Sequence, residues 1–230
     1  MNQKILNMTK FIIDTGKLSK NKKQLLNTLN KFKLVIFDLD DTIFPLYCYD
    51  IIVFRNLIKK ISQKNKINKK KAFDYLVSEK HFKKSKQKLF SIFLKKFNLV
   101  NKVSEKSLVN FYQNHSIIKN FKPPSLKNLI KKLKKENIKL LLITEGYMKR
   151  QNNKIKSLGI ENLFDYKIIL DGKNNRKYKP SVVGLKKYLK IIKKNSSIYL
   201  GDSIKDKQIS KKLNIDFYYF NMSKFIRKYC

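Results

Sequence analysis

The sequence predicts a doubly wound α/β fold: a five-stranded parallel sheet with an inserted all-helical domain. Three observations support this prediction, namely five short apolar runs, helical patterns between the last four runs, and a long helical stretch between the first run and the second. Strands buried on both faces form continuous apolar runs, and strands that alternate with helices form parallel sheets covered on both sides. We therefore expect a Rossmann-like core.

The five runs have the length and continuity of strands buried on both faces. They cover residues 34–37, 140–143, 168–170, 198–200 and 217–220. Helical patterns between the last four runs cover about 148–158, 181–194 and 204–213, and a helix at 125–136 leads into the second strand. Strand and helix therefore alternate from the second strand onward.

The segment between the first and second strands is expected to form a separate helical domain. Its amphipathic patterns fall at about 47–62, 68–79, 85–97 and 104–114. Pro45 follows the first strand, and Pro123-Pro124 precedes the helix at 125–136, so both ends have a chain breaker. We place the insertion at 46–121, the α/β core at 31–45 and 122–230, and a basic helical extension at 1–30.

Composition indicates a globular protein with a strong positive charge. The 230 residues are 42% hydrophobic and 30% charged, with a formal net charge of +38. The 50 Lys, 27 Ile and 23 Asn beside one Ala and four Arg are the pattern expected from AT-rich coding. Surfaces that read nucleic acids favour Arg, so we do not expect nucleic-acid binding. The positive field favours an anionic, phosphate-bearing substrate.

Nothing in the sequence indicates a membrane, a zinc site or a disulfide framework. No apolar stretch is long enough to span a bilayer, and charged residues interrupt the N-terminal segment where a signal peptide needs an apolar block. Cys48 and Cys230 have no metal-binding spacing. We expect a cytoplasmic protein, and the sequence does not indicate its oligomeric state.

The acidic residues are clustered. The chain has only 16 of them, and five follow two predicted strands: Asp38, Asp40, Asp41, Asp202 and Asp206. In open α/β sheets, ligands bind beyond the carboxyl ends of the strands. Mg²⁺ prefers oxygen ligands and usually takes one or two carboxylates together with substrate phosphate and water. The clustering therefore predicts a cation or a carboxylate nucleophile at this edge.

Two further groups suit an anion at the same edge. Thr144 ends the second strand and is followed by Glu145 and Gly146, which brings a hydroxyl and backbone N–H groups to the start of a helix. Lys179 precedes a further predicted helix and supplies a positive charge. Carboxylates, a hydroxyl and an ammonium together indicate phosphoryl transfer, in which positioning and charge neutralisation carry the catalysis.

These residues resemble the four motifs of the haloacid dehalogenase-like (HAD) hydrolase superfamily. The motifs are Asp38-Leu39-Asp40-Asp41-Thr42, Thr144, Lys179, and Gly201-Asp202-Ser203-Ile204-Lys205-Asp206. The helical insertion after the first motif resembles the C1 cap of the phosphoglycolate phosphatase-like branch. The family commonly has Gly at position 41 and Asn or Asp at position 145.

The resemblance implies a role for each motif residue. Asp38 would be the nucleophile that forms an aspartyl-phosphate, and Asp40 would protonate the leaving oxygen and then activate water. Asp38, the backbone carbonyl of Asp40, and Asp202 would hold Mg²⁺.

The remaining motif residues would bind phosphate or support the catalytic groups. Thr144 and Lys179 would hold the phosphoryl oxygens, with help from the amides of Glu145 and Gly146. Asp206 and Thr42 would orient the catalytic and phosphate-binding side chains without contacting the substrate themselves.

The resulting hypothesis is a Mg²⁺-dependent phosphatase that acts on a small phosphorylated metabolite. Asp40 separates the chain from true dehalogenases, which lack a carboxylate at that position. Two alternatives stay open: a phosphotransferase or mutase of the same fold, and a basic RNA- or anion-binding protein on the same scaffold. His81 and His115 lack an evident acidic partner and are expected to be ordinary surface or interface residues.

Overall fold

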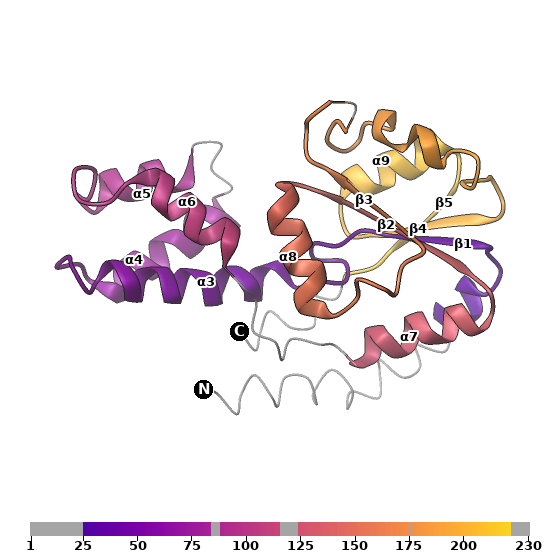
Figure 1. Ribbon diagram of the computed structural model, residues 1–230, viewed down its shortest axis with the longest axis horizontal. Coiled ribbons are helices and arrows are strands. Elements are labelled where there is room, and N and C mark those ends of the chain that lie inside the picture. The colour runs from indigo at the N-terminus through magenta and orange to yellow at the C-terminus, as the bar shows by residue number, and fades with distance from the viewer. Residues whose placement is uncertain (1–24, 84–87, 116–123, 175, 222–230) are drawn as a thin grey trace. The chain divides into compact units, whose positions relative to one another are not determined.

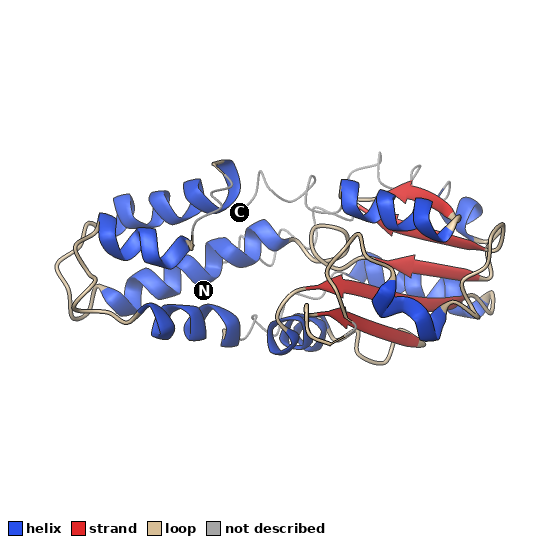
Figure 2. Cartoon of the chain, turned by 90° about the horizontal axis from the view of Figure 1, so that it is seen from above, coloured by secondary structure: helices blue, strands red, loops and turns tan. Residues whose placement is uncertain are grey.

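The computed structural model describes residues 25–83, 88–115, 124–174 and 176–221. Among these, the chain up to Pro45 and from residue 124 onward forms one compact unit, the core unit, and Leu46–His115 forms a second, the helical unit. The core unit holds all the described strands, and the helical unit has only helices and loops (Figure 2). Most of the predicted N-terminal extension and the predicted end of the insertion at 121 lie outside the described residues.

The core unit is built on a five-stranded parallel sheet in the order β3-β2-β1-β4-β5 (Figure 1). The strands are β1 (Leu34–Phe37), β2 (Lys139–Glu145), β3 (Tyr166–Leu170), β4 (Ser197–Gly201) and β5 (Asp216–Tyr219). Phe37 at the end of β1 pairs with Leu142 of β2 and Leu200 of β4. The residues that follow β1 and β4 therefore begin at the same edge, beside the end of β2. The predicted fold class is confirmed.

Helices cover both faces of the sheet. On one face, Ile36, Leu141 and Tyr199 pack in a cluster with Leu185 of η2 (Val183–Tyr188) and Ile209 of α9 (Ile204–Leu213). The other face carries α7 (Pro124–Lys135) and α8 (Met148–Leu158) (Figure 1). Burial of both faces explains why the central strands are continuous apolar runs.

Two expectations about the core need correction. The predicted helix at 181–194 contains only the short 3₁₀-helix η2, because two β-branched residues and a glycine, Val182-Val183-Gly184, weaken α-helix formation there. The predicted fifth strand begins one residue earlier, at Asp216, and none of its four residues is buried. Burial on both faces fails for β5 because it lies at the edge of the sheet.

The helical unit consists of α3 (Leu46–Ile61), α4 (Lys69–Val77), the π-helical turn η1 (Ser78–Phe82), α5 (Leu89–Lys96) and α6 (Glu105–Asn114). Its interior is aromatic. The ring of Tyr112 stacks on Phe54 with centroids 5.9 Å apart and meets Phe90 edge-on at 5.7 Å. Such pairs add to the apolar area that the rings bury.

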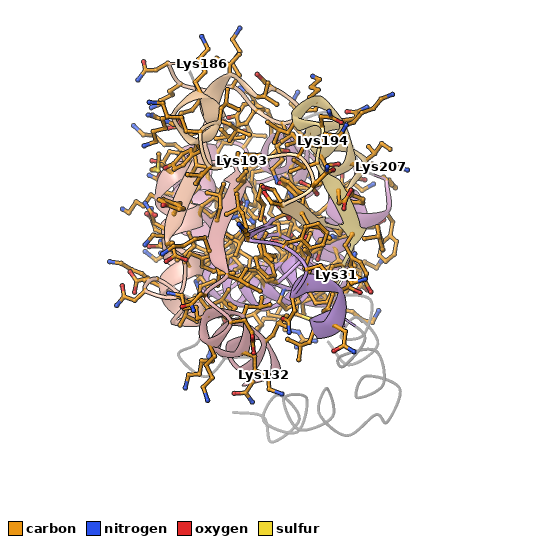
Figure 3. All side chains as sticks on the ribbon, turned by 90° about the vertical axis from the view of Figure 1, so that its right-hand side faces the viewer. Lys31, Lys132, Lys186, Lys193, Lys194 and Lys207 are labelled. Carbon is orange, nitrogen blue, oxygen red and sulfur yellow. The ribbon has the colours of Figure 1, made fainter. Side chains whose placement is uncertain are left out.

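The positive charge is spread over the surface of the core unit. The lysines labelled in Figure 3 are all exposed, and Lys132, Lys186 and Lys207 come from α7, η2 and α9. These three helices lie on both faces of the sheet, so their lysines do not line one groove. No helix in the described part of the chain is long and apolar enough to cross a membrane.

Candidate active site

The side chains of the four motifs converge beyond the carboxyl ends of the strands in the core unit. Asp38 follows β1, Thr144 is near the end of β2, and Asp202 follows β4. Lys179, from the loop after β3, lies against Asp38, and Asp206 comes from the first turn of α9. The fold therefore brings together groups that are up to 168 residues apart in sequence.

Lys179 binds two buried carboxylates. Its Nζ donates to Asp38 Oδ1 and lies 2.7 Å from Asp206 Oδ1, and all three side chains are at least nine-tenths buried. Burial raises the pKa of Asp38 to about 7 although Lys179 lowers it, and the negative charge of Asp206 adds to the rise. Burial alone would lower the pKa of Lys179, but the negative charge of Asp38 and other nearby groups holds this pKa well above its usual range. One ammonium is therefore shared by two acids.

Asp206 is fixed by its position in α9. Its Oδ2 accepts from the backbone N–H of Ser203 at 3.2 Å in a capping box and from the Ser203 hydroxyl at 2.5 Å. Its Oδ1 accepts from the hydroxyl of Tyr199 at 3.1 Å. A Cβ atom at Gly201 would lie only 2.5 Å from the Cβ of Asp206. The glycine of the fourth motif therefore lets α9 start directly against β4, and Asp206 is placed to orient Lys179.

Asp202 and Asp38 are linked through Thr42. The Thr42 hydroxyl lies 3.0 Å from Asp38 Oδ2 and 3.3 Å from Asp202 Oδ1. Burial raises the pKa of Asp202 to about 6, and the charge of Asp41 contributes. Asp41 itself has φ of 60°, a left-handed conformation that glycine adopts more readily. This conformation explains why the family commonly has glycine at position 41.

The carboxylates fit a divalent cation. Asp38, Asp202 and Asp206 each offer an oxygen within 4.8 Å of the others, whereas Lys179 is the ammonium that contacts two of them. Oxygen ligands and excess negative charge are what Mg²⁺ requires. Asp206 accepts from three side chains, whereas Asp38 and Asp202 accept from two each, so Asp38 and Asp202 have more capacity left for a cation.

The Asp40 carboxylate is held by two residues of α8. Lys154 Nζ lies 2.5 and 2.7 Å from the two carboxylate oxygens, and Gln151 Nε2 donates to Oδ2 at 3.1 Å. Burial would raise the pKa of Asp40, but the charges of Lys154 and Arg150 outweigh it and lower this pKa below its usual range. Sequence reasoning missed Lys154 and Gln151. A signal existed, because both fall on the buried face of α8 with Ile155 and Leu158.

The predicted phosphate-binding residues differ in whether their polar groups already have hydrogen-bond partners. Thr144 Oγ1 is buried and has no hydrogen-bond partner among the described residues. The Gly146 amide, in contrast, donates to Leu170 O at 3.0 Å in the sheet. The Glu145 carboxylate accepts from Lys205 Nζ at 2.7 Å and from the Lys179 amide at 2.9 Å, so it braces the loop of Lys179. An unpaired buried hydroxyl is costly and points to a ligand at Thr144.

The helical unit contains a buried polar cluster that the sequence did not reveal. Asp50 is fully buried, and its Oδ1 accepts from the Tyr112 hydroxyl at 2.6 Å. His81 Nε2 lies 3.0 Å from Asp50 Oδ2. The expectation that His81 has no acidic partner is therefore wrong, because α3 and η1 bring together residues that are 31 positions apart in sequence.

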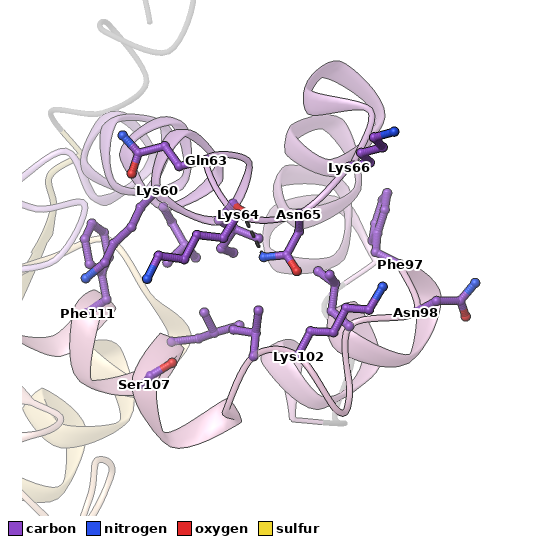
Figure 4. Close-up of a pocket in the computed structure, with 15 residues that line it drawn as sticks. Lys60, Gln63, Lys64, Asn65, Lys66, Phe97, Asn98, Lys102, Ser107 and Phe111 are labelled. Atoms are coloured by element: carbon purple, nitrogen blue, oxygen red, sulfur yellow. Dashed lines mark hydrogen bonds between the residues drawn. The ribbon is translucent and has the colours of Figure 1, made fainter.

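The helical unit also contains a pocket of about 940 Å³ (Figure 4). Its lysines, Lys60, Lys64, Lys66 and Lys102, surround apolar residues such as Leu108, and no acid is among the described residues that line it. It holds none of the motif residues. A pocket without carboxylates cannot hold Mg²⁺ by itself, so the candidate active site is the one in the core unit.

Comparison with known proteins agrees with this geometry. Residues 35–220 match the profile of the family described as haloacid dehalogenase-like hydrolase. The chain belongs to the haloacid dehalogenase-like hydrolase family. Because the family consists of hydrolases, we describe this HAD-family chain as a hydrolase. A comparison with curated protein sequences found no match.

Solved structures share the fold of this HAD-family chain at low sequence identity. The magnesium-bound HAD-hydrolase YfnB from Bacillus subtilis is 17% identical, with a TM-score of 0.58 over 81% of this chain and 86% of that one. A HAD-superfamily hydrolase of subfamily IA from Geobacter sulfurreducens is 13% identical, with a TM-score of 0.57 and the same coverages. The L-2-haloacid dehalogenase from Xanthobacter autotrophicus is 13% identical, with a TM-score of 0.52 over 81% of this chain and 76% of that one.

Proposed function

We propose that this HAD-family hydrolase is a Mg²⁺-dependent phosphatase that cleaves a small phosphorylated metabolite through an aspartyl-phosphate on Asp38. One observation carries the proposal: the buried Thr144 hydroxyl has no hydrogen-bond partner among the described residues and lies near the end of β2. This strand pairs with β1, and β1 is followed by Asp38, which Lys179 contacts. A phosphoryl oxygen would satisfy that hydroxyl. Asp40 favours phosphate esters over halides, because an ester oxygen needs a proton to leave and a halide does not.

In the first half of the reaction, an Asp38 oxygen attacks phosphorus and the ester P–O bond breaks. Asp40 enters this step protonated and gives its proton to the leaving oxygen, which leaves it ionised for the second half. The Lys179 ammonium donates to Asp38 Oδ1 and the Thr42 hydroxyl donates to Asp38 Oδ2, so hydrogen bonds to both oxygens fix the orientation of the nucleophile. Fixing a nucleophile before attack removes an entropic cost of reaction.

In the second half, Asp40 takes a proton from water, and the water oxygen attacks the phosphorus of the aspartyl-phosphate. The bond between Asp38 and phosphorus breaks, which releases phosphate and restores the Asp38 carboxylate. Lys154 favours the ionised form of Asp40, the form that this step requires.

Mg²⁺ would be held by Asp38, the backbone carbonyl of Asp40, and Asp202. When bound, the ion neutralises charge on the transferring phosphoryl group. The excess of carboxylates over ammonium groups around Asp38 and Asp202 supports this assignment.

Phosphoryl oxygens are assigned first to the Thr144 hydroxyl and the Lys179 ammonium. The side chain of Glu145 acts indirectly, through the Lys179 amide that it binds. The Gly146 amide would have to leave its bond to Leu170 O to take part, so its contribution is secondary.

The helical unit is proposed to be a C1-type cap that selects the substrate. Its place in the chain supports this role, because it begins at Leu46, four residues after Thr42. A cap restricts access to small substrates and limits bulk water during reaction.

The test is release of inorganic phosphate from a panel of sugar, nucleotide and short organic-acid phosphates, with Mg²⁺ and with EDTA. We expect release from at least one class that stops in EDTA and returns with Mg²⁺. Transfer of the phosphoryl group to a second sugar hydroxyl without phosphate release would favour a phosphotransferase or mutase. No turnover of any phosphate ester, with halide released from 2-haloacids, would overturn the proposal.

A further inference from the structure

Lys154 is a buried cation whose place in the fold needs an explanation. Its side chain is only 1% exposed, which makes it one of the largest fully buried side chains in the described part of the chain. Transferring an ammonium out of water is costly unless it is paired and hydrogen-bonded. The exposed lysines elsewhere on α8, such as Lys156, incur no such cost. Burial at this one position therefore indicates a specific partner.

That partner is Asp40. Lys154 Nζ contacts both carboxylate oxygens, at 2.5 and 2.7 Å, and lies 5.4 Å from the centre of the Phe44 ring. Gln151, one turn earlier on α8, donates to Asp40 Oδ2 at 3.1 Å and to the carbonyl of Glu145 at 2.5 Å. Two donors from successive turns of one helix thus fix the rotation and the tilt of the carboxylate.

We propose that Lys154 is a positioning residue that orients the Asp40 carboxylate for water activation in the second half of the reaction. This role rests on the proposed phosphatase function. In that step the Asp40 carboxylate accepts a proton from water while the water oxygen bonds to phosphorus and the Asp38–phosphorus bond breaks. A base must lie within hydrogen-bonding reach of the proton it removes, and small misplacements are costly. A helix is a rigid support for such a group.

The choice of step gives a kinetic signature. p-Nitrophenyl phosphate has a good leaving group, so formation of the aspartyl-phosphate needs little help from an acid. Its hydrolysis still needs Asp40 as a base. A misplaced Asp40 therefore slows the second half alone, and the aspartyl-phosphate accumulates.

The experiment compares Lys154→Met with the wild-type protein on p-nitrophenyl phosphate and Mg²⁺, in steady-state and stopped-flow assays. We expect kcat to fall by at least about 10-fold, since general base catalysis contributes roughly 10²- to 10⁴-fold. KM should fall in parallel, so kcat/KM should change by less than about twofold. A burst of about one nitrophenolate per active site should precede the slow steady state.

Matched variants separate this role from general damage to the fold. Lys156→Met, an exposed lysine on the same helix, should have wild-type kinetics. Lys154→Arg keeps a cation and should recover part of kcat. Gln151→Leu removes the weaker donor to Asp40 and should show a smaller fall in kcat, again with a nitrophenolate burst. This variant keeps the test valid if thermal unfolding shows that Lys154→Met does not fold.

The outcomes distinguish the two proposals. Wild-type kcat in folded Lys154→Met, or equal losses in kcat and kcat/KM without a burst, would overturn the positioning role alone, with the phosphatase intact. A wild-type protein that turns over neither p-nitrophenyl phosphate nor any panel ester with Mg²⁺ would overturn the proposed function, and the role of Lys154 with it.

Discussion

The core unit and the helical unit both bury a carboxylate beside a basic side chain, but the two clusters differ in how many acids share one base. In the helical unit, each oxygen of Asp50 has a neighbour, the Tyr112 hydroxyl at 2.6 Å and His81 Nε2 at 3.0 Å. In the core unit, Asp38 shares one ammonium with Asp206, and the Thr144 hydroxyl has no partner among the described residues.

This difference separates a structural cluster from a reactive one. Burial raises the pKa of Asp38 to about 7 and that of Asp202 to about 6, and so works against the charged forms of both carboxylates. Arrangements of this kind are typical of functional sites, which give up stability for activity. We therefore expect substitutions in the core cluster to change turnover, and substitutions in the Asp50 cluster to change stability.

The largest effect is expected for Asp38→Asn. Turnover should fall by more than about 10³-fold, because an amide cannot form the acyl-phosphate. The far-ultraviolet circular dichroism spectrum should match that of the wild type, since the amide nearly keeps the shape of the carboxylate. Phosphate release at the wild-type rate would contradict the assignment of Asp38 as the nucleophile. It would also contradict the distinction between a reactive cluster in the core unit and a structural cluster in the helical unit.

A smaller effect is expected for Asp202→Ala, which removes the proposed metal ligand that follows β4. The Mg²⁺ concentration for half-maximal activity should rise by at least about 10-fold, because one of few charged ligands is lost. Glu136→Ala, at an exposed acid beyond the end of α7, should leave that concentration unchanged. Full activity of the wild type in EDTA would contradict the metal assignment.

The opposite pattern is expected for Tyr112→Phe in the helical unit. This change keeps the ring that packs on Phe54 but removes the hydrogen bond to buried Asp50. The free energy of unfolding in urea should fall by about 1–3 kcal/mol, the usual cost of removing one partner of a buried hydrogen bond, with kcat within about twofold of wild type. Tyr75→Phe on α4 serves as the control. A loss of kcat without a loss of stability would make the Asp50 cluster part of the active site.

The two clusters also differ in how far the sequence could predict them. Four site residues lie at or beyond the end of an apolar strand, or in the loop after one: Asp38, Thr144, Lys179 and Asp202. In open parallel sheets, ligands bind beyond the carboxyl ends of the strands, and this rule placed the four residues at one edge. The Asp50–His81 pair depends on how helices α3 and η1 pack, and neither periodicity nor a motif specifies that contact.

Lys154 shows a different limit. It lies in a chain with 54 basic residues, and composition cannot separate one buried lysine from its exposed neighbours. Its helical spacing with Gln151 and Leu158 was the available signal, since it placed polar residues on an apolar face of α8.

The predicted helix at 181–194 was wrong for a local reason, namely the weak α-helix propensity of Val182-Val183-Gly184.

The smallest effect is expected from the surface charge of both units. Raising the ionic strength from 0.1 to 1 M shortens the Debye length from about 10 to about 3 Å, so kcat/KM for an anionic ester should fall while kcat changes little. The active site of the core unit is shielded from this change by its burial. Oligonucleotide binding that survives physiological salt, without phosphatase activity, would instead favour a basic binding protein.

The most direct test of the central claim is the stereochemical course of hydrolysis at phosphorus. A thiophosphate ester made chiral with ¹⁶O and ¹⁸O is hydrolysed in H₂¹⁷O, and the configuration of the released thiophosphate is determined. Attack by Asp38 followed by attack by water comprises two in-line displacements, each with inversion, so the account predicts overall retention. Overall inversion would show a single displacement by water and would contradict the aspartyl-phosphate on Asp38.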